Sequence, residues 1–144
     1  MAYVGQPVPS TVININAAKV SDGKSVRVTV PATTTIEAGK FYLLDGFLGC
    51  AFQSVTTGAG EIAEVILNIE QAEYETDQID TDTSPTLTFA KGTLIYWDAD
   101  NNRFTETSTG NRLAGRVTQA KDSKGVICFI LGPQVVETAE TVQD

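Results

Sequence analysis

Residues 19–25 of this chain end in Gly-Lys-Ser, as a phosphate-binding P-loop does. A P-loop also needs a glycine at its first fixed position, where the backbone turns around a phosphate, and this chain has Ala18 there. The loop must lie between a strand and a helix, and 144 residues without a doubly wound α/β pattern leave no room for an ATPase core. A β-turn at Asp22-Gly23 explains the segment, so we expect no ATP site.

The pattern Asp98-x-Asp100-x-Asn102 places side-chain oxygens at alternate positions, as the start of a calcium-binding loop does. Such a loop continues with glycine and is closed by a bidentate acid, but this chain has Arg103 and Thr109 at those positions. A turn built on short Asx side chains is therefore the preferred interpretation. A second acidic group, within residues 77–82, is predicted to be a solvated loop rather than a cation site.

The residue types that support catalysis are scarce. The chain has no histidine, which is the commonest general base and metal ligand. No serine or cysteine has a plausible base beside it in the sequence, although carboxylates paired only by the fold stay an alternative. Cys50 and Cys128 lie in apolar runs, so two buried, reduced thiols are expected, with a disulfide as the alternative. We predict that the protein is not an enzyme and needs no metal or cofactor.

Short alternating segments bounded by turn residues position these side chains. Val26, Val28 and Val30 alternate with polar residues, and Asp45-Gly46 is typical of a tight hairpin. The sequence predicts an all-β, single-domain barrel or sandwich of about ten short, mostly antiparallel strands. The predicted strands cover residues 11–16, 26–30, 41–44, 47–53, 61–75, 87–89, 93–98, 103–107, 112–118 and 126–131.

Two of these segments carry further information. Residues 61–75 match helical and strand spacing equally well, and their β-branched residues favour a strand. Residues 126–131 are apolar on both faces, which predicts a central strand or a subunit contact.

Charge excludes some classes of partner. The net charge is −8 and the isoelectric point about 4.4, whereas nucleic acids and anionic membranes bind Lys-rich and Arg-rich surfaces. No apolar run is long enough to span a membrane, and the N-terminus lacks the basic start of a signal peptide. We expect neither nucleic acid nor membrane as a partner.

An ordered set of motifs resembles a family of small phage capsid decoration (cement) proteins. Tyr96-Trp-Asp98 is followed by an Asn-rich turn, a Thr-rich strand and Gly110-Asn-x-Leu-x-Gly-x-Val117. Upstream, Gly46-Phe-Leu-Gly-Cys-Ala51 and Gly58-Ala-Gly-Glu61 occur in the matching order, and the likeness covers residues 26–131. Members of this family are sometimes labelled recombinases, a function that the missing ATP site argues against.

The resemblance implies a protein that binds the outer surface of the mature phage head and stabilises contacts between major capsid protein subunits. It also implies a homo-oligomer, with a trimer expected rather than a dimer, made in the host cytoplasm and located on the outer capsid surface of the virion. The alternative is a carbohydrate-binding or adhesin-like β-module of a phage tail or surface structure. That alternative requires several exposed, coplanar aromatic side chains.

The N-terminal residues combine prolines with apolar side chains. Pro7 and Pro9 prevent an internal strand, while Tyr3, Val4 and Val8 are apolar where a disordered tail is usually polar. We predict an extended arm whose residues Tyr3, Val4, Pro7 and Val8 bind a partner, with a frayed terminus as the alternative. The chain is thus predicted to divide into this arm, a β-barrel or sandwich decoration domain, and an acidic C-terminal tail, at residues 1–10, 11–133 and 134–144.

The first prediction concerns nucleotides and DNA. Adding ATP should leave the melting temperature unchanged, because Ala18 replaces the P-loop glycine. DNA binding should be undetectable at micromolar protein, because the net charge is −8. Thermal melts with ATP and DNA titrations at two salt concentrations measure both. A salt-sensitive micromolar affinity for DNA, or stabilisation by ATP, would contradict the prediction.

Overall fold

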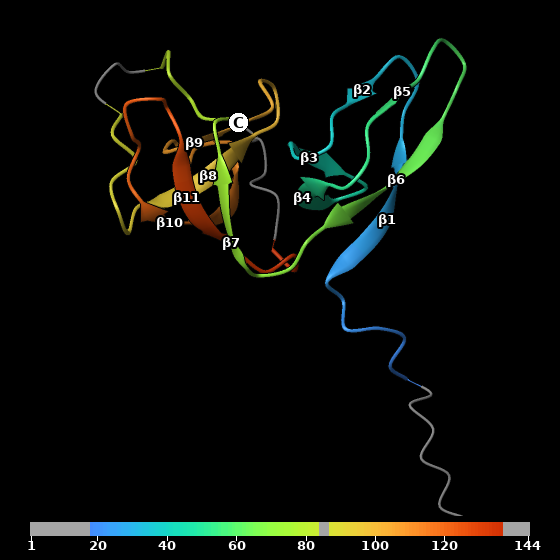
Figure 1. Cartoon of the computed structure of the whole chain (residues 1–144), viewed down its shortest axis with the longest axis horizontal. Coiled ribbons are helices and arrows are strands. Elements are labelled where there is room, and N and C mark those ends of the chain that lie inside the picture. The colour runs from blue at the N-terminus through green and yellow to red at the C-terminus, as the bar shows by residue number, and fades with distance from the viewer. Residues whose placement is uncertain (1–17, 84–86, 137–144) are drawn as a thin grey trace, which may run out of the picture.

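The computed structural model describes residues 18–83 and 87–136, and the predicted strand at residues 11–16 lies outside this part of the chain. All regular secondary structure in the described residues is strand (Figure 1), so they contain no helix that could span a membrane. The strands are β1 (Ser25–Val30), β2 (Thr35–Ile36), β3 (Phe41–Leu44), β4 (Phe47–Ala51), β5 (Val55–Thr56), β6 (Ala63–Asn68), β7 (Glu73–Thr76), β8 (Leu94–Asp98), β9 (Arg103–Thr105), β10 (Arg112–Gln119) and β11 (Ile127–Leu131). The predicted all-β class is confirmed.

The strands form three antiparallel sheets. A four-stranded sheet has the order β1-β6-β4-β3, and a five-stranded sheet has the order β7-β11-β10-β8-β9. Figure 1 shows the four-stranded sheet on the right and the curled five-stranded sheet on the left. Strands β2 and β5 pair as a small third sheet above β1 and β6. The first half of the chain therefore builds one sheet and the second half the other.

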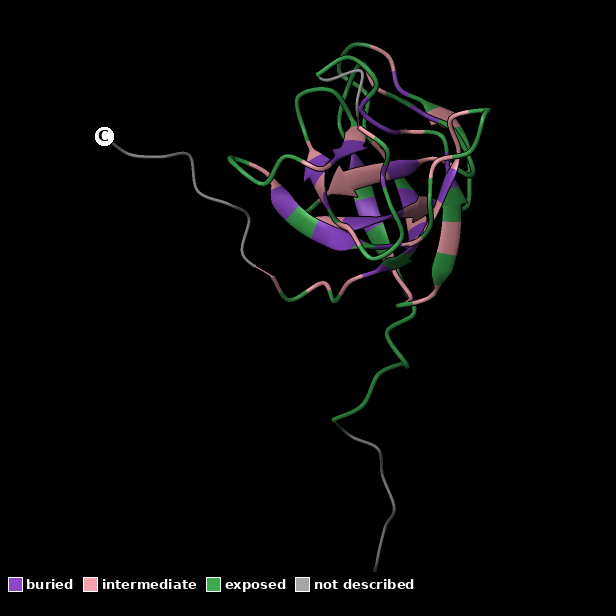
Figure 2. Ribbon diagram, turned by 90° about the vertical axis from the view of Figure 1, so that its left-hand side faces the viewer, coloured by how far each residue is buried: buried purple, intermediate pink, exposed green. Residues whose placement is uncertain are grey.

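The main core lies between the two large sheets. Phe41 from β3 packs its ring against Phe104 and Phe129 of the five-stranded sheet, with ring centroids 5.3 Å apart in both pairs. Trp97 lies 4.9 Å from Phe104 in the same cluster and is fully buried. Figure 2 shows these buried segments at the centre of the molecule. A second cluster of aliphatic residues involves β2 and β5 and the valines of β1.

Two glutamine side chains join the sheets by imitating a neighbouring strand. Gln78 accepts a hydrogen bond from the Phe41 amide (2.6 Å) and donates one to the Phe41 carbonyl (3.0 Å). Gln134 makes the same pair of bonds to Leu48, at 2.9 Å each. Phe41 lies on the edge strand β3, and Leu48 lies beyond the point where β4 pairs with β6. The carboxamides thus satisfy main-chain groups that have no partner strand.

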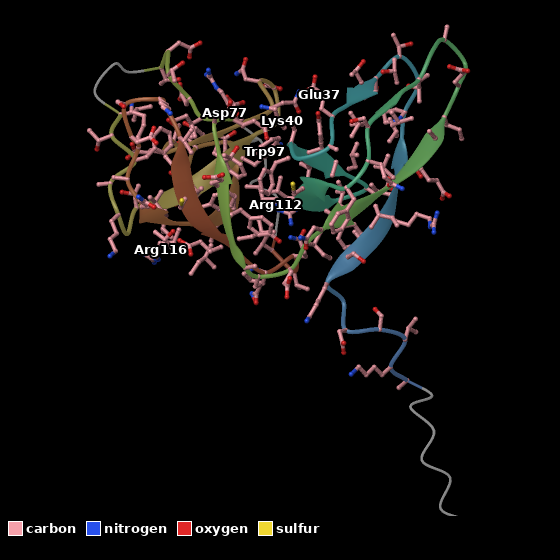
Figure 3. The ribbon with its side chains drawn as sticks, in the orientation of Figure 1. Glu37, Lys40, Asp77, Trp97, Arg112 and Arg116 are labelled. Carbon is pink, nitrogen blue, oxygen red and sulfur yellow. The ribbon has the colours of Figure 1, made fainter. Side chains whose placement is uncertain are left out.

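We call the contacts of Gln78 with Phe41 and of Gln134 with Leu48 the glutamine joint between the sheets. Arg112 adds a buried charge to this joint. Its side chain is almost completely buried between the sheets (Figure 3) and donates to the Gly46 carbonyl and to the Gln134 carboxamide oxygen, the latter at 3.0 Å. Burial lowers the pKa of the Arg112 guanidinium. Because Gln134 also binds Leu48, one connected polar network ties β10 to the β3–β4 hairpin.

Most of the predicted turns and strands agree with the structure. Asp45 and Gly46 both have positive φ (52° and 85°), which is the geometry of a tight hairpin. Residues 126–131 contain the central strand β11, as predicted. Residues 61–75 are strand rather than helix, as predicted, but they form two strands, β6 and the start of β7, which belong to different sheets. The predicted strand at residues 87–89 is wrong. Phe89 has a φ of 47°, and its amide donates to the Glu106 carboxylate, so the chain bends there and forms no ladder.

The glutamine joint leads to the second prediction. Replacing Gln134 with alanine should lower the free energy of unfolding by about 2–4 kcal/mol, because buried polar groups of Leu48 and Arg112 lose their partners. Gln119→Ala is the matched control, because this exposed side chain accepts only the Cys128 thiol, and should cost under about 0.5 kcal/mol. Urea denaturation measures both variants. Equal effects would mean that the joint contributes no specific stability.

Candidate functional site

The Gly-Lys-Ser segment forms a turn and leads into a strand. Gly23 has a φ of 69°, and β1 begins two residues later at Ser25. The Lys24 ammonium lies 3.5 Å from the Glu70 carboxylate. With a strand where a P-loop needs a helix, the segment lacks the geometry of a phosphate site.

Two members of the acidic group at residues 77–82, together with Asp98, surround an arginine. Arg103 contacts three carboxylates, those of Asp80 (3.4 Å), Asp82 (2.8 Å) and Asp98 (3.3 Å). The prediction of a solvated loop is wrong for Asp80, which is 1% exposed. Its distant partners Arg103 and Thr105 make burial tolerable, since Thr105 donates a hydrogen bond at 2.9 Å.

Hydrogen bonds control the charge of Asp80. Burial alone would raise the pKa of the Asp80 carboxyl, but donors from Thr83, Thr105 and the Asp82 amide outweigh burial and hold the pKa well below its usual range. For Arg103, burial opposes the charged form, and contacts with Asp82, Asp80 and Asp98 still raise its pKa. Both groups therefore stay ionised at neutral pH.

This arrangement replaces a metal with a side-chain cation. Arg103 occupies the position at which a calcium loop has glycine, and its positive guanidinium balances the negative charge of the surrounding aspartates. The side-chain carboxamide of Asn101 also donates a hydrogen bond to the Asp98 carboxylate at 2.8 Å. Within residues 18–83 and 87–136, no group of three or more His, Cys, Asp or Glu side chains has the geometry to hold a metal ion.

The two thiols are free and half-buried, so the expectation that they are reduced agrees with the structure, and the expectation that they are buried holds only in part. Cys50 faces the main core, and burial raises its pKa. Cys128 lies on β11, where burial and nearby acidic groups raise its pKa. Neither thiol has the lowered pKa of an activated nucleophile.

The aromatic side chains are mostly in the core. Phe41, Phe104 and Trp97 are buried, and the tyrosines of the described residues are half-buried. Phe52 is the exposed aromatic side chain within that part of the chain. One exposed ring does not form the stacking platform that the carbohydrate-binding alternative requires.

The outer face of the five-stranded sheet carries an unexpected surface. Leu94, Leu113 and Ile130, on the adjacent strands β8, β10 and β11, are 37%, 40% and 47% exposed. Arg116 lies between Leu94 and Ile130 in the strand register, on the side away from the four-stranded sheet (Figure 3). These side chains line a shallow hollow of about 270 Å³. We call it the outer apolar groove; its lining is Gln71, Leu94, Leu113, Gly115, Arg116, Ile130, Leu131, Gly132 and Pro133.

The sequence held one signal for this groove. Residues 126–131 are apolar on both faces, and Ile130 belongs to the face that turns outward. The predicted partner-binding residues Tyr3, Val4, Pro7 and Val8 lie outside the described residues and stay a prediction.

The third prediction concerns Asp80. Asp80→Asn should lower the free energy of unfolding by about 3 kcal/mol at pH 7, because it leaves Arg103 without its buried carboxylate. Because folding lowers the pKa of Asp80, its contribution is complete above the unfolded-state pKa of about 3.9 and is lost as the pH falls below it. The gap between wild type and variant should therefore be constant from pH 7 to pH 5 and shrink below about pH 4.

Asp82→Asn is the control for this experiment. Asp82 contacts the same guanidinium, but its side chain is 75% exposed, so the substitution should cost under about 1 kcal/mol. Urea denaturation between pH 7 and pH 3 provides the values. A gap for Asp80→Asn that does not change with pH would contradict a structural role for the ionised carboxylate.

Comparison with known proteins shows which family the chain belongs to. The chain matches the family model of phage cement proteins over residues 20–132. No curated protein and no solved structure matches it. The matched range includes both large sheets, the Arg103 cluster and most of the residues that line the outer apolar groove. The match covers most of the chain, and this protein therefore belongs to the phage cement protein family, whose role on the capsid is structural.

Proposed function

We propose that this protein binds the outer surface of the mature phage head and stabilises contacts between major capsid protein subunits. The observation that carries the proposal is the family match over residues 20–132. It is supported by a body in which the buried Asp80 is paired internally with Arg103 and whose outer sheet face exposes aliphatic side chains.

Such a function depends on contact area and repetition. A protein that binds the mature lattice, and not its disassembled subunits, stabilises the lattice by RT ln(1 + [L]/Kd) per site. Each contact contributes little, but a homo-oligomer at a symmetry axis engages several capsid subunits at once and gains avidity. A trimer fits this role better than a dimer, because decoration sites with threefold or quasi-threefold symmetry are expected from the resemblance.

The charge of the chain suits assembly in two stages. After synthesis in the host cytoplasm, a net charge of −8 keeps the protein soluble and limits non-specific aggregation. The same charge disfavours adsorption to the packaged genome, since DNA phosphates repel it. The protein therefore stays soluble and off the genome until it meets the outer capsid surface.

The N-terminal arm, residues 1–10, is the proposed segment for partner binding. Tyr3, Val4 and Val8 provide apolar anchors, and Pro7 restricts the backbone to extended conformations before binding. The acidic tail from residue 137 onward has no comparable apolar anchors apart from Val142. We expect the arm, and not the tail, to contribute to assembly.

The fourth prediction tests binding to the capsid. Purified protein mixed with undecorated mature heads should bind saturably and raise the temperature at which the heads break open. Deleting residues 2–9 should weaken the binding isotherm, and the melting temperature of the variant should show that the β-domain stays folded. Deleting residues 137–144 is the matched control and should change neither value. Absence of saturable binding by the intact protein would contradict the proposed function.

A further inference from the structure

The outer apolar groove has the composition of a binding site for an uncharged, apolar chain. Leu94, Leu113 and Ile130 are each more than a third exposed and lie on adjacent strands, and contiguous exposed patches on soluble domains usually mark interactions. Arg116 is the one charged side chain among the residues that line the groove. Its guanidinium is already bound to the Gly92 carbonyl at 2.7 Å. The groove thus holds one positive charge, partly engaged by a backbone carbonyl, and no carboxylate that would attract a basic ligand.

One segment of this chain has the matching composition. The first eighteen residues contain no Asp, Glu, Lys or Arg, so all ten basic and eighteen acidic residues of the protein lie beyond Ala18. The same segment includes Tyr3, Val4 and Val8, which are apolar. In a protein with a net charge of −8, an arm without charged side chains meets no like charge in a groove that is lined by aliphatic side chains and one arginine.

Residues 22–24, on the chain that leads to the arm, lie close to one end of the groove. Gln71 and Pro133 line the outer apolar groove, and both also line an adjacent hollow whose other wall is formed by residues 22–24. The Ile69 amide donates to the Lys24 carbonyl at 3.0 Å and fixes the chain at this point. In every copy of the protein, the groove therefore lies beside residues 22–24, from which the chain leads to the arm.

Residues 18–21, which lead to the arm, run away from the groove of their own copy. Residues 18–21 are all exposed, Val20 is 97% exposed, and Figure 1 shows the described chain below β1 running away from both sheets. The seventeen residues that precede Ala18 span at most roughly 60 Å when extended, which is long enough to reach a neighbouring molecule.

We propose that the outer apolar groove of one copy binds residues 1–10 of a second copy. Tyr3, Val4 and Val8 cover Leu94, Leu113 and Ile130, and the two prolines reduce the entropy that the arm loses on binding. An arm-in-groove contact is heterologous, so repetition around an axis closes a ring. The inference rests on the proposed decoration function, for which it describes how the copies join, and it is tested without capsids.

The experiment compares molar masses in solution by light scattering at one protein concentration. Wild type should be an oligomer, whereas Leu113→Asp and the deletion of residues 2–9 should both be monomeric. Ile62→Asp is the matched control, because Ile62 is 74% exposed and lies outside the groove, and it should stay oligomeric. Thermal melts of the same samples check that every variant is folded.

A peptide of residues 1–10 identifies the occupant directly. A fluorescent peptide should bind the protein that lacks residues 2–9, and Leu113→Asp in that protein should weaken the affinity at least tenfold. An excess of unlabelled peptide should convert the wild-type oligomer to monomers, an outcome that needs no groove variant to fold.

Four results would overturn the inference. They are a monomeric wild type, an oligomeric Leu113→Asp variant, a deletion variant that stays oligomeric while Leu113→Asp dissociates, and a peptide that binds equally well with Asp at position 113. The third result would assign the groove to a face-to-face contact between two sheets. Failure of wild type to bind mature heads, with the masses as expected, would contradict the proposed function and leave the arm-in-groove contact standing.

Discussion

The carboxamide of Gln134 gives the backbone of Leu48 both hydrogen bonds that a neighbouring strand would give, and it also accepts one from Arg112. A hydrophobic interface alone fixes the relative position of two sheets loosely, because apolar contacts have little directionality. Paired hydrogen bonds to a fixed backbone allow one position, and leaving them unmade in a buried joint costs more than making them gains. The joint also determines the outer surface. Gln134 follows Pro133 in the chain and Arg112 precedes Leu113, so two residues that line the outer apolar groove are anchored by their neighbours.

Most of the shifted pKa values in the described residues lie further from neutral pH than the usual values of those groups. Folding lowers the pKa of Asp77, Asp80 and Asp122, and it raises those of Lys40, Cys50 and Cys128. Burial and the carboxylate of Glu70 raise the pKa of Tyr74 to about 12. Each of these shifts moves the group further from neutral pH, whereas catalytic acids and bases are shifted toward it. Arg112 shifts the other way, but its unperturbed pKa is so high that it stays charged.

The parts of the fold that were predictable from sequence are those set by neighbouring residues. The Asp45-Gly46 hairpin and the left-handed Asn102 that ends the Asx turn follow from short-range turn chemistry. The errors involve partners far apart in the chain. Asp80 is buried because Thr105 and Arg103 reach it from β9, and Leu48 is satisfied by a residue 86 positions away. Alternation shows that Leu113 and Ile130 point away from their neighbours, but only the packing of the two sheets decides which face is covered.

The outer apolar groove itself depends on the absence of a side chain. A Cβ at Gly115 would lie 2.1 Å from the Ile130 carbonyl oxygen, so any other residue would force β10 and β11 apart. The register with β8 also shifts between Leu113 and Gly115, and this bulge lets Leu113 and Arg116 both face outward, although they are three positions apart. Regular alternation would have turned one of them into the core. The missing side chain leaves a hollow between Leu113 and Ile130, and the bulge places aliphatic side chains around it. A short sequence, Leu-Ala-Gly-Arg, therefore creates the exposed surface that the rest of the five-stranded sheet supports.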